Sequence, residues 1–283
     1  MKYIFIFVTL FSANLRAQPV LKFDKRFVEC EDKWVAFPPT KDSSFPFGFI
    51  YIDATAGLTL QYEGAFKISN TGVFIHTTKP DDRAEVIVRL QPNQVHVALI
   101  PENKFDELEI KVIPDWLKIY EPDTVSIERL YSWGFMYNGW NECAKALTFL
   151  EKAQKINPNY KGLAVELAFS YNCLSQYDKA ITVLNSAIQA NPTDAYFHKE
   201  LIYAEVNLGQ LDKAAESCKK ALAICTDNTQ FNGEMCYTLL RGFYYKKDKL
   251  NFNLWLNEVK KWAASNELYS SNIKKMEEDV ATW

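Results

Sequence analysis

The chain has 283 residues, of which 48% are hydrophobic, which is too apolar for a disordered protein and enough for about two domains. Its formal net charge is −3, from 32 basic and 35 acidic residues. This near balance, without a basic stripe that carries interleaved aromatic residues, argues against a nucleic-acid-binding protein.

The segment 1–17 has the composition of a secretory signal peptide. Lys2 supplies a positive start, residues 3–11 are apolar, and Ala17 offers a small residue for cleavage. The apolar run is well short of the roughly 20 residues that span a bilayer, and no other stretch is long enough. We therefore expect an exported protein, periplasmic, cell-surface or secreted, with no transmembrane span in the mature chain.

Residues 18–122 are predicted to form an antiparallel β-sandwich-like domain, or a small barrel, because apolar residues alternate through most of this segment. The pattern predicts seven or eight short strands, which include residues 45–51, 58–62, 66–69, 73–77, 84–90, 95–100 and 109–113.

Four alternating aromatic residues mark the first of these strands: Phe45, Phe47, Phe49 and Tyr51. A strand with this pattern is expected to face its own core. Aromatic faces can also stack on sugars, so the aromatic excess of this domain leaves a glycan- or cell-wall-binding module as an alternative function.

After residues 121–123 the apolar spacing becomes helical and stays so to the end, which predicts a second domain at residues 123–283. Alanines recur in it at a fixed 34-residue interval, in two series: Ala146, Ala180 and Ala214, and Ala153, Ala187 and Ala221. A fixed period of this length is typical of stacked helix pairs that leave a concave surface open to a partner.

These residues resemble the tetratricopeptide repeat family, whose unit adds Tyr and Pro to the alanine positions. Tyr137 with Pro158 and Tyr171 with Pro192 match this pattern, whereas the third unit departs from it at Glu205. Units are expected at about 127–160, 161–194 and 195–228, followed by a degenerate cap at 229–283 that begins with an insertion at 229–234. The resemblance implies an α-α superhelix, so we predict a multidomain α+β protein.

In this family the first helix of each unit lines the groove, which implies a set of partner-binding residues there. Phe135, Phe169 and Tyr203 recur at the 34-residue interval and could form an aromatic ladder. Asn138 and Asn172 could hydrogen-bond the backbone of an extended peptide. The alternative is that the aromatic side chains pack against neighbouring helices or against the β domain.

Some family members hold a terminal carboxylate with a clamp of Lys, Arg and Asn. The corresponding positions here carry Tyr131, Phe135, Glu166, Tyr196 and Glu200, so that basic clamp is missing. We therefore predict a non-enzymatic scaffold whose groove, with Tyr131 and Tyr196 among its residues, takes an apolar or mixed segment of a protein or peptide partner.

No enzyme motif is present: there is no glycine-rich phosphate loop, no Gly-x-Ser-x-Gly elbow and no His-Glu-x-x-His pair. A metal site would need His76 and His96 to converge with carboxylates such as Asp81 and Asp82. We expect no catalytic residue, no metal site and no cofactor.

The six cysteines allow 15 pairings. Cys143, Cys173 and Cys218 fall in predicted helices, and we interpret them as free thiols that act as small apolar residues. Cys225 and Cys236 flank a polar loop and are the one pair that we single out as a candidate disulfide.

Overall fold

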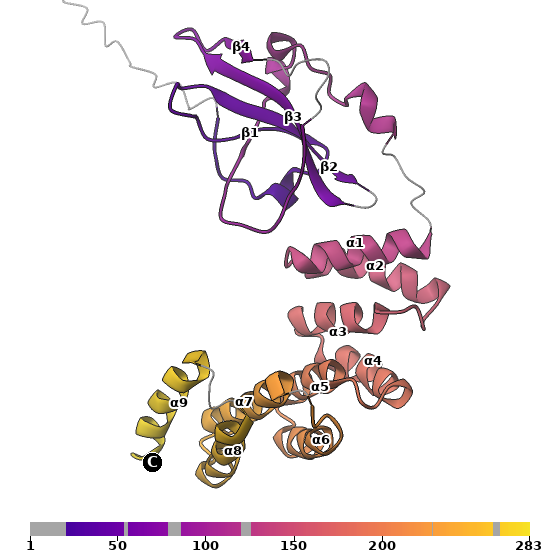
Figure 1. Ribbon diagram of the computed structural model, residues 1–283, viewed down its shortest axis with the longest axis vertical. Helices are drawn as coiled ribbons and strands as arrows, with labels where there is room; N and C mark the ends of the chain where they lie inside the picture. The colour runs from indigo at the N-terminus through magenta and orange to yellow at the C-terminus, as the bar shows by residue number, and fades with distance from the viewer. Residues whose placement is uncertain (1–20, 54–55, 79–85, 120–125, 228, 263–266) are drawn as a thin grey trace, which may run out of the picture. The chain divides into compact units, whose positions relative to one another are not determined.

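The structure is a computed structural model that describes residues 21–53, 56–78, 86–119, 126–227, 229–262 and 267–283 (Figure 1). The chain divides into two compact units, Met1–Glu121 and Pro122–Trp283, and each is described by itself. The predicted signal peptide at residues 1–17 lies outside the described residues.

The first unit contains an antiparallel sheet in the order β4-β3-β2-β1-β6, in which β5 pairs with the first half of β3 and β4 with its second half. Its strands are β1 Lys33–Ala36, β2 Phe45–Asp53, β3 Gly57–Ile68, β4 Phe74–Thr78, β5 Val86–Arg89 and β6 Ala98–Leu99. The antiparallel sheet that the alternating pattern predicts is confirmed.

One face of this sheet forms an aromatic core, as the alternation along β2 predicts. Phe47, Phe49 and Tyr51 are at most 1% exposed, and the ring of Phe49 lies 5.1 Å from that of Trp34 and 5.8 Å from that of Trp116. Short 3-10 helices cover this face: η2 Glu102–Lys104, η3 Asp106–Leu108 and η4 Asp115–Ile119. Phe47, Phe49 and Tyr51 are therefore not available to stack on a sugar, whereas Phe45 is only partly buried.

The structure corrects three of the predicted strands. Residues 58–62 and 66–69 belong to one long strand, β3, whose register with β4 shifts between Ala65 and Phe66. The strand predicted at residues 109–113 does not form, because Glu109 ends η3 with a left-handed backbone (φ 55°) and the amide of Ile110 donates to the carbonyl of Phe105. A chain that turns back on itself in this way cannot extend along a sheet edge.

The second unit is a succession of helix pairs, as the tetratricopeptide resemblance implies (Figure 1). The helices are α1 Ile127–Gly139, α2 Cys143–Ile156, α3 Leu163–Cys173, α4 Tyr177–Ala190, α5 Ala195–Asn207, α6 Leu211–Ile224, α7 Thr229–Tyr245, α8 Lys249–Trp262 and α9 Glu267–Val280. None of these helices is both long and apolar enough to cross a membrane.

Small residues let the helices of each pair approach closely. Ala146, Ala180 and Ala214 are all fully buried, and a Cβ added to Gly134 would lie 2.3 Å from the side chain of Leu150. The turn between the two helices also repeats, since Asn141, Ser175 and Gly209 adopt positive φ angles of 60°, 58° and 81° at 34-residue intervals. The repeat is thus kept by backbone geometry as well as by side-chain volume.

In the fourth unit, the extra residues do not lie where the sequence predicted them. Helix α7 begins at Thr229, which keeps the 34-residue interval from the start of α5 at Ala195. Helix α8 begins at Lys249, which is later than the same interval from the start of α6 at Leu211 would place it. The extra residues therefore lie at the carboxyl end of α7 and not at 229–234. The first turns of α7 consequently keep the register of the preceding repeats.

The cysteine pairing also differs from the prediction. Cys143, the first residue of α2, forms a disulfide with Cys173, the last residue of α3, while Cys225 and Cys236 are buried free thiols. Stacking of consecutive units brings the start of α2 beside the end of α3, with the two Cα atoms 6.3 Å apart. The bridge therefore fastens the first repeat to the second.

We predict that the Cys143–Cys173 disulfide stabilises the helical unit. It closes a separation of 30 residues, for which constraint of the unfolded chain contributes about 3.6 kcal/mol. Reduction should lower the free energy of unfolding by that amount, and a Cys143→Ser/Cys173→Ser variant should lose as much and no longer respond to reductant. Alkylation of the denatured, unreduced protein should label the four free cysteines. Labelling of all six, or a Cys225–Cys236 crosslink, would contradict the assignment.

Candidate functional site

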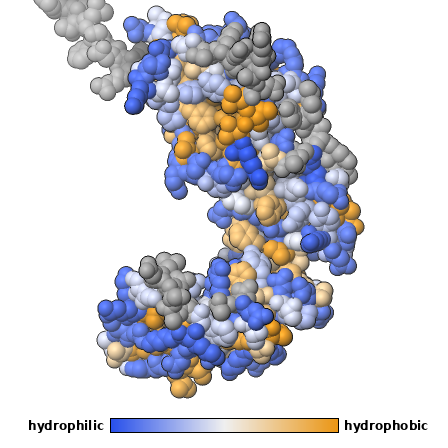
Figure 2. Space-filling view, viewed as in Figure 1, coloured by the Kyte–Doolittle hydropathy of each residue, from blue (hydrophilic) through white to orange (hydrophobic). Residues whose placement is uncertain are grey.

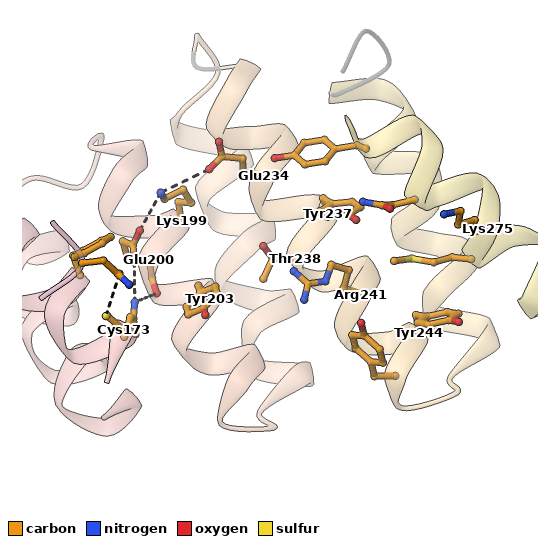
Figure 3. A pocket seen from close by; sticks show the side chains of 17 residues that line it. Cys173, Lys199, Glu200, Tyr203, Glu234, Tyr237, Thr238, Arg241, Tyr244 and Lys275 are labelled. Carbon is orange, nitrogen blue, oxygen red and sulfur yellow. Dashed lines mark hydrogen bonds and ion pairs between the residues drawn. The ribbon is translucent and has the colours of Figure 1, made fainter. Parts of the chain in front are cut away.

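A cavity of about 1040 Å³ opens on the inner side of the helical unit, between α3, α5, α7 and α9 (Figure 3). We call it the groove. Its lining is rich in tyrosine and in residues that can form hydrogen bonds or ion pairs: Asn172, Lys199, Glu200, Tyr203, Glu234, Tyr237, Thr238, Arg241, Tyr244, Tyr245, Tyr269, Asn272 and Lys275, together with Asn141, Phe169, Cys173 and Met276. On the face seen in Figure 2, most of the helical unit's surface is hydrophilic.

The repeated aromatic positions contribute one wall of the groove. Phe169, Tyr203 and Tyr237 come from three consecutive first helices at 34-residue intervals, and all three line it. Phe135, the earlier member of the series, is 54% exposed on α1 but does not line this cavity. Tyr237 lies one repeat period after Tyr203, which is a signal that the sequence contains. It was not used, because an insertion predicted at 229–234 would have put Tyr237 out of register with the repeats.

The two asparagines join consecutive repeats. The amide of Asn138 donates to the backbone oxygen and to Oε2 of Glu166, at 3.0 and 2.8 Å, and Asn172 makes the same pair of bonds to Glu200, at 3.1 and 2.8 Å. In each case the partner belongs to the first helix of the next unit. Both asparagines are buried, so these amide hydrogen bonds serve the repeat stack.

The side-chain oxygens of the two asparagines, Oδ1, differ in their hydrogen bonding. Oδ1 of Asn138 accepts a 2.6 Å bond from the hydroxyl of Ser170. Oδ1 of Asn172 is buried and has no hydrogen-bond partner among the described residues, because Ala204 occupies the position that corresponds to Ser170. We call the contact between consecutive first helices a junction. The second junction, between α3 and α5 at Asn172, is therefore less completely hydrogen-bonded than the first, between α1 and α3 at Asn138.

The third junction replaces the asparagine with an ion cluster. Val206 stands where asparagine is expected, and Glu234 lies 3.7 Å from Nζ of Lys199. The same ammonium lies 3.0 Å from Oε1 of Glu200 and 4.3 Å from the ring of Tyr196. Burial and the carboxylate of Glu200 raise the pKa of Tyr196.

The remaining predicted groove residues pack against their neighbours. The ring of Tyr131 lies 5.2 Å from Tyr160 and 6.3 Å from Phe135. The ring of Tyr196 lies 5.8 Å from that of Phe231. Of the seven residues predicted to bind a partner, Phe169, Asn172 and Tyr203 therefore line the groove, and Tyr131, Phe135, Asn138 and Tyr196 do not.

The histidines do not gather into a site. A ring nitrogen of His76 bonds the carbonyl of Leu108 at 2.9 Å, His96 bonds that of Gln94 at 3.0 Å, and His198 bonds that of Pro192 at 2.8 Å. Across the described parts of the chain, no group of three or more His, Cys, Asp or Glu residues could hold a metal ion. Asp81 and Asp82, considered as ligands from the sequence, lie outside those parts.

Solved structures that are similar to this chain include MamA proteins and a TPR protein. MamA from Desulfovibrio magneticus RS-1 is 23% identical, with a TM-score of 0.45 over 59% of this chain and 88% of that one. TTC0263, a thermophilic TPR protein of Thermus thermophilus, is 20% identical, with a TM-score of 0.44 over 62% of this chain and 91% of that one. No protein-family model matches the chain, and no curated protein is significantly similar to it.

We predict opposite effects of two substitutions at the asparagine junctions. Ser170→Ala removes the donor to Asn138 and should lower the free energy of unfolding by about 1 kcal/mol, whereas Ala204→Ser supplies the missing donor to Asn172 and should raise it by a similar amount. Urea unfolding at equilibrium measures both. A destabilised Ala204→Ser variant would show that the added oxygen does not reach Asn172.

Glu166 should make stability depend on pH. Burial raises its pKa above the usual 4.5, against the opposing hydrogen bond from Asn138. Its contribution to stability is therefore full below about pH 4.5 and is lost as the pH rises through the folded-state pKa. Glu166→Gln keeps an acceptor for Asn138 but has no charge to desolvate, so the variant should be more stable than the parent at pH 7.

Unfolding curves at several pH values test this expectation. The advantage of Glu166→Gln should shrink as the pH falls toward 4.5, because the parent's carboxyl group then becomes neutral too. Glu216→Gln, on the exposed side of α6, controls for the loss of one acidic residue. A Glu166→Gln variant that is less stable than the parent at pH 7 would count against this account.

Proposed function

We propose that the protein is an exported, non-enzymatic interaction module that binds a segment of another polypeptide in the groove. The groove itself is the observation that carries the proposal. Its volume of about 1040 Å³ lies at the upper limit of the roughly 300–1,000 Å³ typical of small-molecule pockets, and it runs along the first helices of successive repeats. Such a surface suits an extended peptide.

The side chains of the groove support binding of a polypeptide. Tyrosine offers a large apolar face with a polar tip and loses little conformational entropy on binding, which is why it is enriched at protein interfaces. Tyr203 is 39% exposed and Tyr245 is 71% exposed, so part of this apolar area is open to a ligand.

Export is supported by two independent features. Residues 1–17 have the composition of a signal peptide, and the Cys143–Cys173 disulfide is a type of bond that persists in oxidising compartments.

The proposal predicts that groove residues select peptides. Short random peptides displayed on phage should be enriched on the immobilised full chain, and the enriched peptides should bind a Phe169→Ala/Tyr203→Ala variant about tenfold or more weakly, because both side chains line the groove. Fluorescence anisotropy with labelled synthetic peptides measures the loss. Phe135→Ala tests whether the contact surface extends to α1.

A matched variant tests the outer surface. Ile156 and Ile224, on the second helices α2 and α6, are 54% and 44% exposed, and neither lines the groove. Ile156→Ala/Ile224→Ala should bind the selected peptides as the parent does. If the groove variant binds as tightly as the parent, or if no peptide is enriched, the proposed function is wrong.

A further inference from the structure

The charges in the groove are separated along its length. Lys199, Glu200 and Glu234 lie together at one end, whereas Arg241 and Lys275 lie toward the other (Figure 3). Nζ of Lys199 is 3.0 Å from one glutamate and 3.7 Å from the other, and Glu200 also accepts the amide of Asn172. The acidic side chains of the groove are thus already held by protein donors.

The two cations at the other end have no such partners. Neither Arg241 nor Lys275 forms an ion pair or hydrogen bond with the described part of the chain, and both side chains are exposed in the groove. Arg241 comes nearly two helical turns after Glu234 on α7, which is about 10 Å along a helix axis. The guanidinium is therefore set apart from the acidic cluster.

Nearby carboxylates on α9 are engaged elsewhere. Asp279 accepts a 2.7 Å bond from the hydroxyl of Tyr244, and Glu277 lies 2.7 Å from Nζ of Lys260. Arg241 also lines a second cavity of about 570 Å³ between α5 and α7. A ligand carboxylate would meet two cations here that form no ion pair with the described part of the chain.

The groove also offers these cations' ligand both apolar aromatic faces and hydrogen-bonding groups. Tyr203, Tyr237 and Tyr245 line the same groove, and so do Thr238 and Asn272, which offer a hydroxyl and an amide. Burial raises the pKa of Tyr203 while the charge of Arg241 opposes that rise, which agrees with their proximity. A ligand suited to this end combines a carboxylate with neighbouring apolar side chains.

We propose that the occupant of the groove is an acidic polypeptide segment, whose aspartate or glutamate side chains pair with Arg241 and Lys275 and whose apolar side chains pack on the tyrosines. This inference rests on the proposed function and specifies its ligand. Charge complementarity carries it, since Arg241 and Lys275 are the charged residues among the described groove residues that form no ion pair.

The acidic end of the groove favours a polypeptide ligand over a polyanion such as a nucleic acid. A nucleic acid carries charge at every residue and would place phosphates near Glu200 and Glu234, with a repulsive result. A polypeptide can place carboxylates at one end and uncharged or basic residues at the other. The site also differs from a clamp across three first helices, because α9 supplies one of its two cations.

The test uses the peptides selected by display on the full chain. The selected sequences should be enriched in Asp and Glu, and replacement of these residues with Gln in the strongest synthetic peptide should weaken binding about tenfold. Arg241→Gln/Lys275→Gln should bind the acidic and the Gln peptide equally. Lys219→Gln/Lys220→Gln, an equal change of charge on the exposed side of α6, should keep the preference.

Other outcomes would overturn the acidic ligand, the proposed function or both. Peptides that lack Asp and Glu, or an unchanged preference in Arg241→Gln/Lys275→Gln, would overturn the acidic ligand while leaving the proposed function intact if binding still requires Phe169 and Tyr203. Sedimentation of the protein alone provides a second measurement. Self-association that Arg241→Gln/Lys275→Gln abolishes would identify a second copy of this chain as the occupant and overturn the inference. Failure to enrich any peptide would overturn both proposals.

Discussion

The close contact between consecutive helices is the constraint on which the rest of the helical unit depends. Fully buried alanines, and Gly134 against Leu150, leave no room for a larger side chain at these contacts. These contacts set the spacing within the helix pairs, and residues one repeat period apart occupy equivalent places, although the third unit carries the larger Ile202 where the first has Gly134. The aromatic wall of the groove and the asparagine–glutamate pairs both follow from this regular spacing.

The contacts between consecutive first helices differ at one repeated position, which carries a glutamate in three units. Glu166 and Glu200 are held by asparagines of the preceding unit, whereas Glu234, at the equivalent place, contacts Lys199 within the groove. The loss of asparagine at Val206 thus changes a buried hydrogen bond into an ion cluster on the inner wall. The chemistry of the inner wall therefore changes where the repeat departs from its own pattern.

Of the predicted aromatic series, Phe169 and Tyr203 line the groove and Phe135 does not. The sequence also assigned Asn138 and Asn172 to a ligand, whereas the structure bonds their amides to Glu166 and Glu200, and only Asn172 also lines the groove. Polar residues on the inner side of a first helix have the same spacing whether they face a groove or the next repeat. The distinction depends on how far the neighbouring unit overlaps them, which local periodicity does not encode. Arg241 was not predicted, because no basic residue stands at the equivalent position of the earlier repeats.

The sequence by itself determined the alternating segment, the helical segment and the 34-residue period, because these follow from the side-chain spacing of single strands and helices. Only the tertiary structure decided that Cys143 pairs with Cys173, that the extra residues lie at the end of α7, and that Lys275 and Arg241 line the same groove. Each of these depends on the distance between helices that are separate in the chain. Such distances are set by packing, and no local pattern records them.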